Sequence, residues 1–262
     1  MPRTLILLTG ASRGFGRSIA LSCAKSGLAK GQPLDFLLTA RDTGLLGETR
    51  SQILALSPSA TVVTHAVDFT LPGLDNLCEG LLNMIPHPGS EYTQVYLINN
   101  AGSLGKLDRL RHQTAADIAP AIHVNLTAPM ALTTAFLRHF ANPTQSTIVN
   151  ISSLAAVTAF DCWGVYCATK AARDMYHKTI AVEEPNVRIL NYAPGPLDTD
   201  MQTRIRDEMP DVPLREVYIQ MHQDQNLVDP AVSAKVLIEL LEKDTYENAA
   251  HIDVYDVEGW QK

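Results

Sequence analysis

The chain has 262 residues, of which 46% are hydrophobic and 19% charged, and this balance excludes a disordered or fibrous protein. A net charge of −7 without any run of lysine and arginine excludes a typical nucleic-acid-binding surface. No apolar run is long enough to span a bilayer, and the apolar start ending at Leu8 is too short for a signal peptide, so we expect a cytoplasmic protein without a membrane partner.

Short apolar runs alternate along the chain with longer segments of helical period. We predict strands at Thr4–Leu8, Asp35–Thr39, Thr61–Ala66, Gln94–Ile98, Ser146–Ile151, Val187–Tyr192 and His251–Val254. We predict helices at Gly16–Lys25, Thr43–Leu56, Leu74–Met84, Ala116–Phe140, Val165–Glu183 and Pro230–Glu242. This alternation indicates an α/β fold: a doubly wound, seven-stranded parallel sheet with helices on both faces.

Domain organisation is predicted to be simple, because the sequence shows no repeat, linker or low-complexity tract. We assign residues 1–256 to one domain and residues 257–262 to a C-terminal tail. The polar segment Asp198–Asp229 is predicted to be either a mobile lid or a surface loop with short helices.

A glycine-rich turn, Thr9–Gly16, follows the first predicted strand and opens the first helix. Glycines let a backbone approach a pyrophosphate closely, and a helix N-terminus offers free N–H groups. The turn therefore predicts a dinucleotide site, although a plain strand–helix connection remains an alternative. The predicted contacts in this turn are Gly10, Ser12, Arg13, Gly14, Phe15 and Gly16.

The end of the second strand decides between the two nicotinamide cofactors. NAD-binding proteins place a carboxylate there for the ribose 2′-hydroxyl, whereas this strand is followed by Arg41 and then Asp42. Arg41, with Arg13, could hold a 2′-phosphate, because a guanidinium pairs with phosphate bidentately. NADPH is favoured, and the alternative is two solvated surface arginines.

Tyr166 and Lys170 stand four residues apart in a predicted helix and so share one face. Ser153 follows the strand that ends at Ile151, which brings its hydroxyl to the same edge of the sheet. A ketone reduction needs a proton donor, and a neighbouring ammonium would lower the phenol pKa toward the working range. Ser153 would stabilise the developing oxyanion. The four cysteines and eight histidines show no metal-binding spacing, so we predict reduced thiols and no metal.

Together with Asn99–Gly102, Asn125 and Pro194–Gly195, these motifs resemble the short-chain dehydrogenase/reductase family over essentially the whole chain. The resemblance implies a single-domain Rossmann-type fold and a homodimer. It also implies that Tyr166 donates the proton, that Lys170 holds the nicotinamide ribose and that Asn125 supports a proton relay. For Asn125, a surface or interface amide is the alternative. Beyond the glycine turn and Arg41, the implied cofactor contacts are Asp42, Asp68, Phe69, Asn100, Tyr166, Lys170, Gly195, Leu197, Thr199 and Met201.

Several stretches, including Tyr166–Met175 and Glu183–Met201, are similar to the members of the family that reduce pterin side-chain carbonyls in tetrahydrobiopterin biosynthesis. This similarity implies that Asp253 anchors the pterin, since a carboxylate accepts two adjacent N–H donors well. Capping of the last strand, or a subunit contact, is the alternative for Asp253. The other implied substrate contacts are Leu104, Ser152, Ser153, Trp163, Tyr166, Gly195 and Met201. A reductase of diketones and a non-catalytic NADPH sensor are the competing functions.

Overall fold

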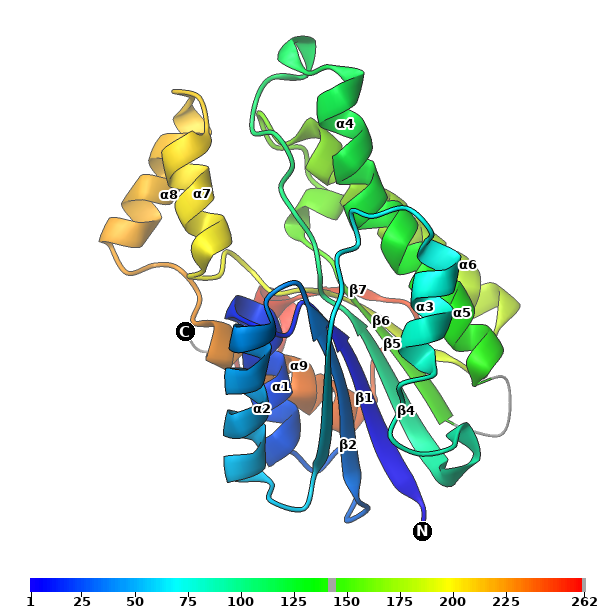
Figure 1. Ribbon diagram of the computed structural model, residues 1–262. Helices are drawn as coiled ribbons and strands as arrows, with labels where there is room; N and C mark the ends of the chain where they lie inside the picture. Colours follow the sequence, from blue (N-terminus) through cyan, green and yellow to red (C-terminus); the bar gives the residue numbers. More distant parts are fainter. Residues whose placement is uncertain (141–144, 261–262) are drawn as a thin grey trace.

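A seven-stranded parallel sheet forms the centre of the computed structural model, which describes residues 1–140 and 145–260 (Figure 1). The strands are β1 (Arg3–Thr9), β2 (Leu34–Ala40), β3 (Thr61–Ala66), β4 (Tyr92–Asn99), β5 (Gln145–Ile151), β6 (Arg188–Ala193) and β7 (His251–Asp253). Their spatial order is β3-β2-β1-β4-β5-β6-β7, with every pair parallel. This order confirms the predicted doubly wound sheet, in which successive strands are added first on one side of β1 and then, from β4 onward, on its other side.

Helices cover both faces of the sheet, as predicted (Figure 1). One face carries α1 (Gly14–Lys25), α2 (Thr43–Leu56) and α9 (Pro230–Lys243). The other carries α3 (Leu74–Leu82), α5 (Ala128–His139) and α6 (Gly164–Glu183). Beyond the carboxyl ends of the strands stand α4 (Ala115–Ile122), α7 (Asp200–Glu208) and α8 (Pro213–Gln223).

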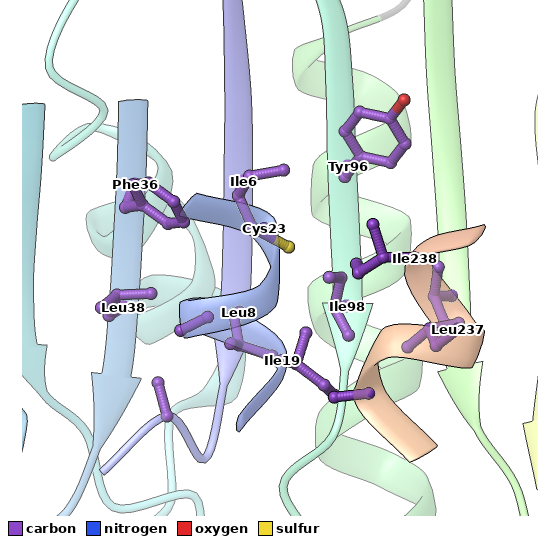
Figure 2. Close-up of a cluster of buried hydrophobic side chains, with 14 of the residues drawn as sticks. Ile6, Leu8, Ile19, Cys23, Phe36, Leu38, Tyr96, Ile98, Leu237 and Ile238 are labelled. Atoms are coloured by element: carbon purple, nitrogen blue, oxygen red, sulfur yellow. The ribbon is translucent and has the colours of Figure 1, made fainter. Parts of the chain in front are cut away.

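The central strands are apolar on both sides because each side packs on a helix layer. In β1, Ile6 and Leu8 face α1 and α9, whereas Leu5 and Leu7 face the opposite layer. Figure 2 shows the side of the sheet that packs on α1 and α9, where side chains of β1, β2 and β4 meet these two helices. The labelled residues of this cluster are Ile6, Leu8, Ile19, Cys23, Phe36, Leu38, Tyr96, Ile98, Leu237 and Ile238. Each such aliphatic side chain stabilises the fold by about 1.5–3 kcal/mol.

The predicted long helix Ala116–Phe140 is interrupted by a π-helical turn at His123–Thr127, between α4 and α5. A π turn inserts an extra residue and changes which side chains face inward. Asn125, at the centre of this turn, is thereby fully buried. The predicted uninterrupted helix was wrong because the π turn leaves no mark in the hydrophobic period.

The segment Asp198–Asp229 contains two short helices, α7 and α8, which agrees with the predicted alternative of a surface loop with short helices. Both helices are largely polar and bury few side chains: Gln202 and Ile205 in α7, and Tyr218 in α8. So little apolar surface gives a weak helical period, which is why the sequence did not give the bounds of these helices. The mobile lid stays a prediction.

The C-terminal segment is packed as far as the structure describes it. Trp260 lies edge-on to Tyr255, with ring centroids 5.7 Å apart, and contacts the core on the α1–α9 side. Gln261 and Lys262 lie outside the described residues. The domain boundary at residue 256 stays a prediction.

A buried ion pair ties the start of β1 to β2 at the amino end of the sheet. Both Asp35 carboxylate oxygens accept hydrogen bonds from Arg3, each at 2.6 Å, and Tyr92 donates a third at 2.9 Å. Burial alone would raise the pKa of Asp35. The hydrogen bonds together lower it by a larger amount, so the pKa lies below its usual value.

We expect Asp35→Asn to lower the free energy of unfolding by about 1.5–3 kcal/mol at neutral pH, because hydrogen bonds to a charged group are lost. Since the folded-state pKa is depressed, this contribution is fully present above about pH 4. It is lost as the pH falls through the folded-state pKa. Urea unfolding at neutral and acidic pH should therefore show a difference between wild type and variant that shrinks in acid. An unchanging difference would contradict the assignment.

Candidate active site

The glycine-rich turn at the end of β1 is shaped by steric limits. Gly10 and Gly14 have φ angles of +71° and +52°, which favour glycine. A Cβ atom at Gly16 would overlap the carbonyl oxygen of Gly10, so this position admits no larger residue. Asn100, after β4, donates from Nδ2 to the carbonyl of Thr9 at 2.9 Å and thereby fixes the turn from below.

The N-terminus of α1 is free to bind an anion. Arg13 is the N-cap residue but makes no side-chain capping bond, and the first turn holds no acidic residue. Its N–H groups and partial positive charge therefore fit a pyrophosphate, as the family resemblance requires. Phe15 contributes only backbone here, because its ring is buried in the core beside Tyr192.

Arg17 supports this turn and was not predicted from the sequence. Its guanidinium donates to the carbonyl of Ser12 at 2.6 and 3.0 Å and to the carbonyl of Leu45 at 3.2 Å. Thr49 adds a bond from its hydroxyl to the Ala11 carbonyl at 3.1 Å. From the sequence, an arginine in the first turn of a helix is expected to be exposed to solvent. Only the fold shows which carbonyls it reaches.

Four predicted cofactor contacts lie at the start of α1 and after β2 and β3, and three of them already interact with other side chains or backbone groups. Asp42 caps α2 by accepting from Leu45 N at 2.9 Å. Arg13 pairs with Asp200 of α7 at 2.7 Å, with both side chains exposed. Asp68 has a pKa lowered by hydrogen bonds from Thr70 and, to a smaller extent, by the charge of Arg41. Arg41 itself is exposed beside the turn and makes no hydrogen bond among the described residues.

The remaining predicted cofactor contacts surround the turn on other elements. Thr199 begins α7, and its methyl group lies 3.4 Å from where a Cβ of Gly14 would stand. Gly195 has a φ of +79° and leaves room for Val228 and Val254. Leu197 forms a parallel bridge with Val228. The other two are partly buried: Phe69 against the core of the α3–α5 side, and Met201 against the cluster around Tyr166.

Ser153, Tyr166 and Lys170 come together at the carboxyl end of β5. Tyr166 and Lys170 lie in the first turns of α6, and the lysine Nζ is 5.4 Å from the centre of the tyrosine ring. The Ser153 hydroxyl accepts from Ala155 N at 3.1 Å and lowers the pKa of the nearby Tyr166 phenol. Lys170 is 4% exposed and donates to the carbonyl of Ile151 at 2.6 Å. An ammonium has three N–H groups, so Lys170 keeps donors for ribose hydroxyls.

The electrostatics of this group differ from the expectation. Burial raises the pKa of Tyr166 to about 12, while the charge of Arg173 and the hydrogen bond with Ser153 oppose the rise. Burial and repulsion by Arg173 hold the pKa of Lys170 well below its usual value, partly offset by Asp174. The positive charge of Arg173 thus acts on both groups, lowering the pKa of the phenol and of the amine.

Asn125 hydrogen-bonds the loop that follows β4. Its side chain donates to the Ser103 carbonyl at 2.7 Å and accepts from Ser103 N at 2.8 Å. These two bonds engage the amide oxygen and one N–H of the amide nitrogen. Because Asn125 is fully buried, the alternative of a surface amide is wrong. Its predicted role in a proton relay stays a prediction.

The predicted substrate walls form an apolar cluster around Tyr166. Trp163 lies edge-on to Tyr166 with centroids 5.8 Å apart and stacks on Tyr218 of α8 at 5.6 Å. Leu104 and Met201 belong to the same cluster. Tyr218 was missed, because α8 carries no motif. Ser152 is 2% exposed, and its hydroxyl donates to Asp174 inside the protein, so it does not join these walls.

Asp253 ends β7 at the same edge of the sheet. One of its oxygens, Oδ1, accepts from Tyr255 N at 3.1 Å and caps a short helix, so the capping alternative is realised. The backbone N–H of Asp256 also caps onto the Asp253 side chain, and the Asp256 carboxylate accepts in return from Asp253 N at 3.4 Å. Burial raises the pKa of Asp253, the hydrogen bond from Tyr255 N opposes this rise, and the charge of Asp256 adds a smaller increase.

Residues 1–140 and 145–260 show neither a metal-binding cluster nor a membrane-spanning helix. No group of three His, Cys, Asp or Glu side chains is arranged to hold a metal ion. None of the helices combines the length and apolar character needed to cross a membrane.

The comparisons with known proteins agree with this geometry. The short chain dehydrogenase family profile matches residues 4–210. The chain belongs to the short-chain dehydrogenase/reductase family. The "Sepiapterin reductase" of Rattus norvegicus is 41% identical over 256 residues, covering 96% of both chains. The "Benzil reductase ((S)-benzoin forming)" of Bacillus subtilis is 30% identical over 260 residues, covering 97% of this chain and 98% of the other.

A solved structure supports the same fold. The KRED1-Pglu enzyme superposes with a TM-score of 0.80 at 24% identity, covering 95% of this chain and all of the other. The family and its sepiapterin reductase relatives identify the chain as an oxidoreductase of carbonyl groups with a nicotinamide cofactor. The glycine turn and the Ser153–Tyr166–Lys170 group are the features of this chain that fit such chemistry.

We expect Gly16→Ala to weaken dinucleotide binding by roughly tenfold or more, since overpacking against the Gly10 carbonyl costs about 1–3 kcal/mol. Fluorescence titration with NADPH measures this loss, and a thermal melt separates it from unfolding. Gly47→Ala is the matched control, because a Cβ there meets nothing within 4 Å. Equal binding by both variants would refute the role of the close turn.

Proposed function

We propose that this protein reduces pterin side-chain carbonyls, such as those of sepiapterin and 6-pyruvoyl-tetrahydropterin, with NADPH in tetrahydrobiopterin biosynthesis. The observation that carries the proposal is the buried carboxylate of Asp253 at the edge of the sheet where Tyr166 lies. Sepiapterin reductase relatives at 36–41% identity, matched over about 96% of the chain, support the same substrate class.

A pterin suits this site on chemical grounds. Its amino-pyrimidinone edge presents adjacent N–H donors, which a carboxylate accepts in pairs. A carboxylate oxygen has more than one lone pair, so Asp253 can accept from a pterin while it caps the short helix Val254–Asp256. The apolar cluster with Leu104, Trp163 and Met201 offers a surface on which a flat heterocycle can lie.

In the proposed reaction, bound NADPH supplies a hydride to the carbonyl carbon. Tyr166 donates the proton from its phenol to the carbonyl oxygen. The Ser153 hydroxyl hydrogen-bonds that oxygen as negative charge develops on it. Lys170 holds the ribose, and Asn125 supports the return of a proton to the phenol.

The preference for NADPH follows from the end of β2. Ala40 ends the strand, and the nearest carboxylate, Asp42, is turned to cap its own helix. A ribose 2′-hydroxyl would thus lack the acceptor that NAD-binding proteins provide. Arg41 instead offers an exposed guanidinium for a 2′-phosphate.

A dicarbonyl reductase of the same fold is the second candidate function. The apolar walls around Tyr166 would suit an aromatic diketone, and the Bacillus relative is named benzil reductase. The two candidates differ at Asp253, which a diketone does not need. A cytoplasmic location and a homodimer, which the family resemblance implies, complete the proposal as predictions.

The decisive experiment compares wild type with Asp253→Asn in NADPH consumption with sepiapterin. We expect a loss in kcat/KM of roughly 10–100-fold, because a hydrogen bond to a charged group contributes about 1.5–3 kcal/mol. Glu258→Gln, at an exposed carboxylate five residues further along the chain, is the control variant, and benzil is the control substrate. Tyr166→Phe should abolish turnover but retain NADPH binding. Equal loss with both substrates, or none with sepiapterin, would reject the anchor.

The raised pKa of Asp253 adds a pH signature to the same experiment. The carboxylate form is needed for the pterin, and this form is lost as the pH falls through the raised pKa. We therefore expect the KM for sepiapterin to rise at a higher pH than the usual aspartate value would give. In the Asp253→Asn variant, the KM for sepiapterin should not rise with falling pH in this way.

We expect Arg41→Asp to weaken NADPH binding by roughly 10–100-fold while NADH binding changes little, because charged hydrogen bonds to the phosphate are lost. Direct titration with both cofactors measures the ratio. Arg111→Asp, at an exposed arginine of the short helix Leu110–His112, carries the same charge change as a control. An unaltered cofactor ratio in Arg41→Asp would contradict the phosphate contact.

A further inference from the structure

A single buried carboxylate, that of Asp174 in α6, joins three elements beneath the candidate active site. Its Oδ1 accepts from Nδ2 of Asn150 in β5 at 2.9 Å and from the hydroxyl of Ser152, just after β5, at 2.6 Å. Its Oδ2 lies 2.6 Å from Nδ1 of His251 in β7, and the ring donates because a carboxylate only accepts. Asp174 is 6% exposed, so water competes little for these bonds.

His251 shares its strand and its face of the sheet with Asp253. Strand β7 has only three residues and pairs with β6 alone among the described strands. Ile252 packs against the core on the α1–α9 side, so the residues before and after it point to the opposite side, where α6 lies. The histidine and the proposed pterin anchor therefore face the same helix layer, two residues apart.

Backbone pairing alone does not fix where β7 lies relative to α6. The three residue pairs between β6 and β7 set the height of β7 along the sheet. They do not set the distance of this edge strand from the helix layer, because a sheet twists and its edge can bend. The bond between Asp174 and His251 ties the helix to the strand directly and sets that distance. Nε2 of His251 has no hydrogen-bond partner in the described part of the chain, so the tie depends on Nδ1.

The helix at the other end of this tie carries the reacting group. Tyr166, Lys170 and Asp174 follow one another at intervals of four residues in α6, and so lie along one face of the helix. A change in the distance between α6 and β7 therefore also changes the distance between Tyr166 and Asp253.

We propose that His251 is a positioning residue: bonded to α6 through Asp174, it sets how far the pterin anchor Asp253 lies from the proton donor. This inference rests on the proposed function, because it concerns how a pterin held at Asp253 presents its side-chain carbonyl. Hydride and proton must both reach that carbonyl, so an anchor displaced by about 1 Å can cost about 100-fold in rate. The glycine turn follows β1, and three strands separate β1 from β7, so NADPH binding depends little on this bond.

The test compares wild type with His251→Phe, which keeps a ring but removes the hydrogen bond. We expect kcat/KM for sepiapterin to fall by roughly 10–100-fold, while the NADPH affinity measured by titration changes little. His251→Asn should recover most of the activity, because its amide offers a donor near the position of Nδ1. His112→Phe is the matched control and should behave as wild type, since that Nδ1 also meets an aspartate, Asp108 at 3.1 Å, but on an exposed segment.

A double-mutant cycle separates positioning from a loss of structure. If His251 acts through Asp253, His251→Phe should cost little more in an Asp253→Asn background, where no anchor is left to position. A role confined to folding would instead multiply the two losses and weaken NADPH binding as well. That result, or an unaltered kcat/KM in a folded His251→Phe protein, would overturn the inference.

Two outcomes of the same experiment are told apart by wild type. If His251→Phe does not fold, His251→Phe/Asp174→Asn removes the buried charge together with its donor and should show the same dependence on Asp253. A wild type that reduces no sepiapterin would reject the proposed function and this inference with it. An active wild type with independent losses at His251 and Asp253 would reject this inference alone.

Discussion

A row of buried polar side chains across the sheet is the constraint on which the candidate site depends. Register places Asn99 of β4 beside Asn150 of β5, Asn150 beside Asn191 of β6, and Asn191 beside His251 of β7. Asn150 donates to Asn191 at 2.9 Å and, through α6, is linked to both Arg173 and Asp174. Buried polar groups are costly unless they are bonded, so a shift in this register would strand several of them.

The row also sets the positions of the residues above it. Ser153 stands three residues beyond Asn150, and Asp253 stands two beyond His251, so both leave the sheet at nearly the same height. Asp174 bonds the Ser152 hydroxyl and the His251 ring and thereby holds α6 against β5 and β7. The helix that carries Tyr166 and Lys170 is thus aligned with the strand ends by hydrogen bonds rather than by apolar packing alone.

The sequence predicts the sheet and the helices around it because two-sided burial forces continuous apolar strands between amphipathic helices. It predicts the glycine turn and the Tyr166–Lys170 pair because their spacing is local. What escaped prediction depends on tertiary contacts. The π turn at Asn125 breaks no local rule, and Tyr218 matters only because α8 folds back over Trp163. From the sequence, Arg173 is expected to be an exposed arginine of a helix, whereas in the structure it is fully buried.

The electrostatics of Tyr166 show what a motif alone leaves out. The burial that protects a carbonyl reduction from water raises the phenol pKa and lowers the lysine pKa, so burial disfavours the charged form of each group. The positive charge of Arg173, three residues beyond Lys170 on α6, opposes the rise at the phenol. The acid–base properties of Tyr166 therefore depend on the buried surroundings of α6 as well as on its four-residue spacing from Lys170.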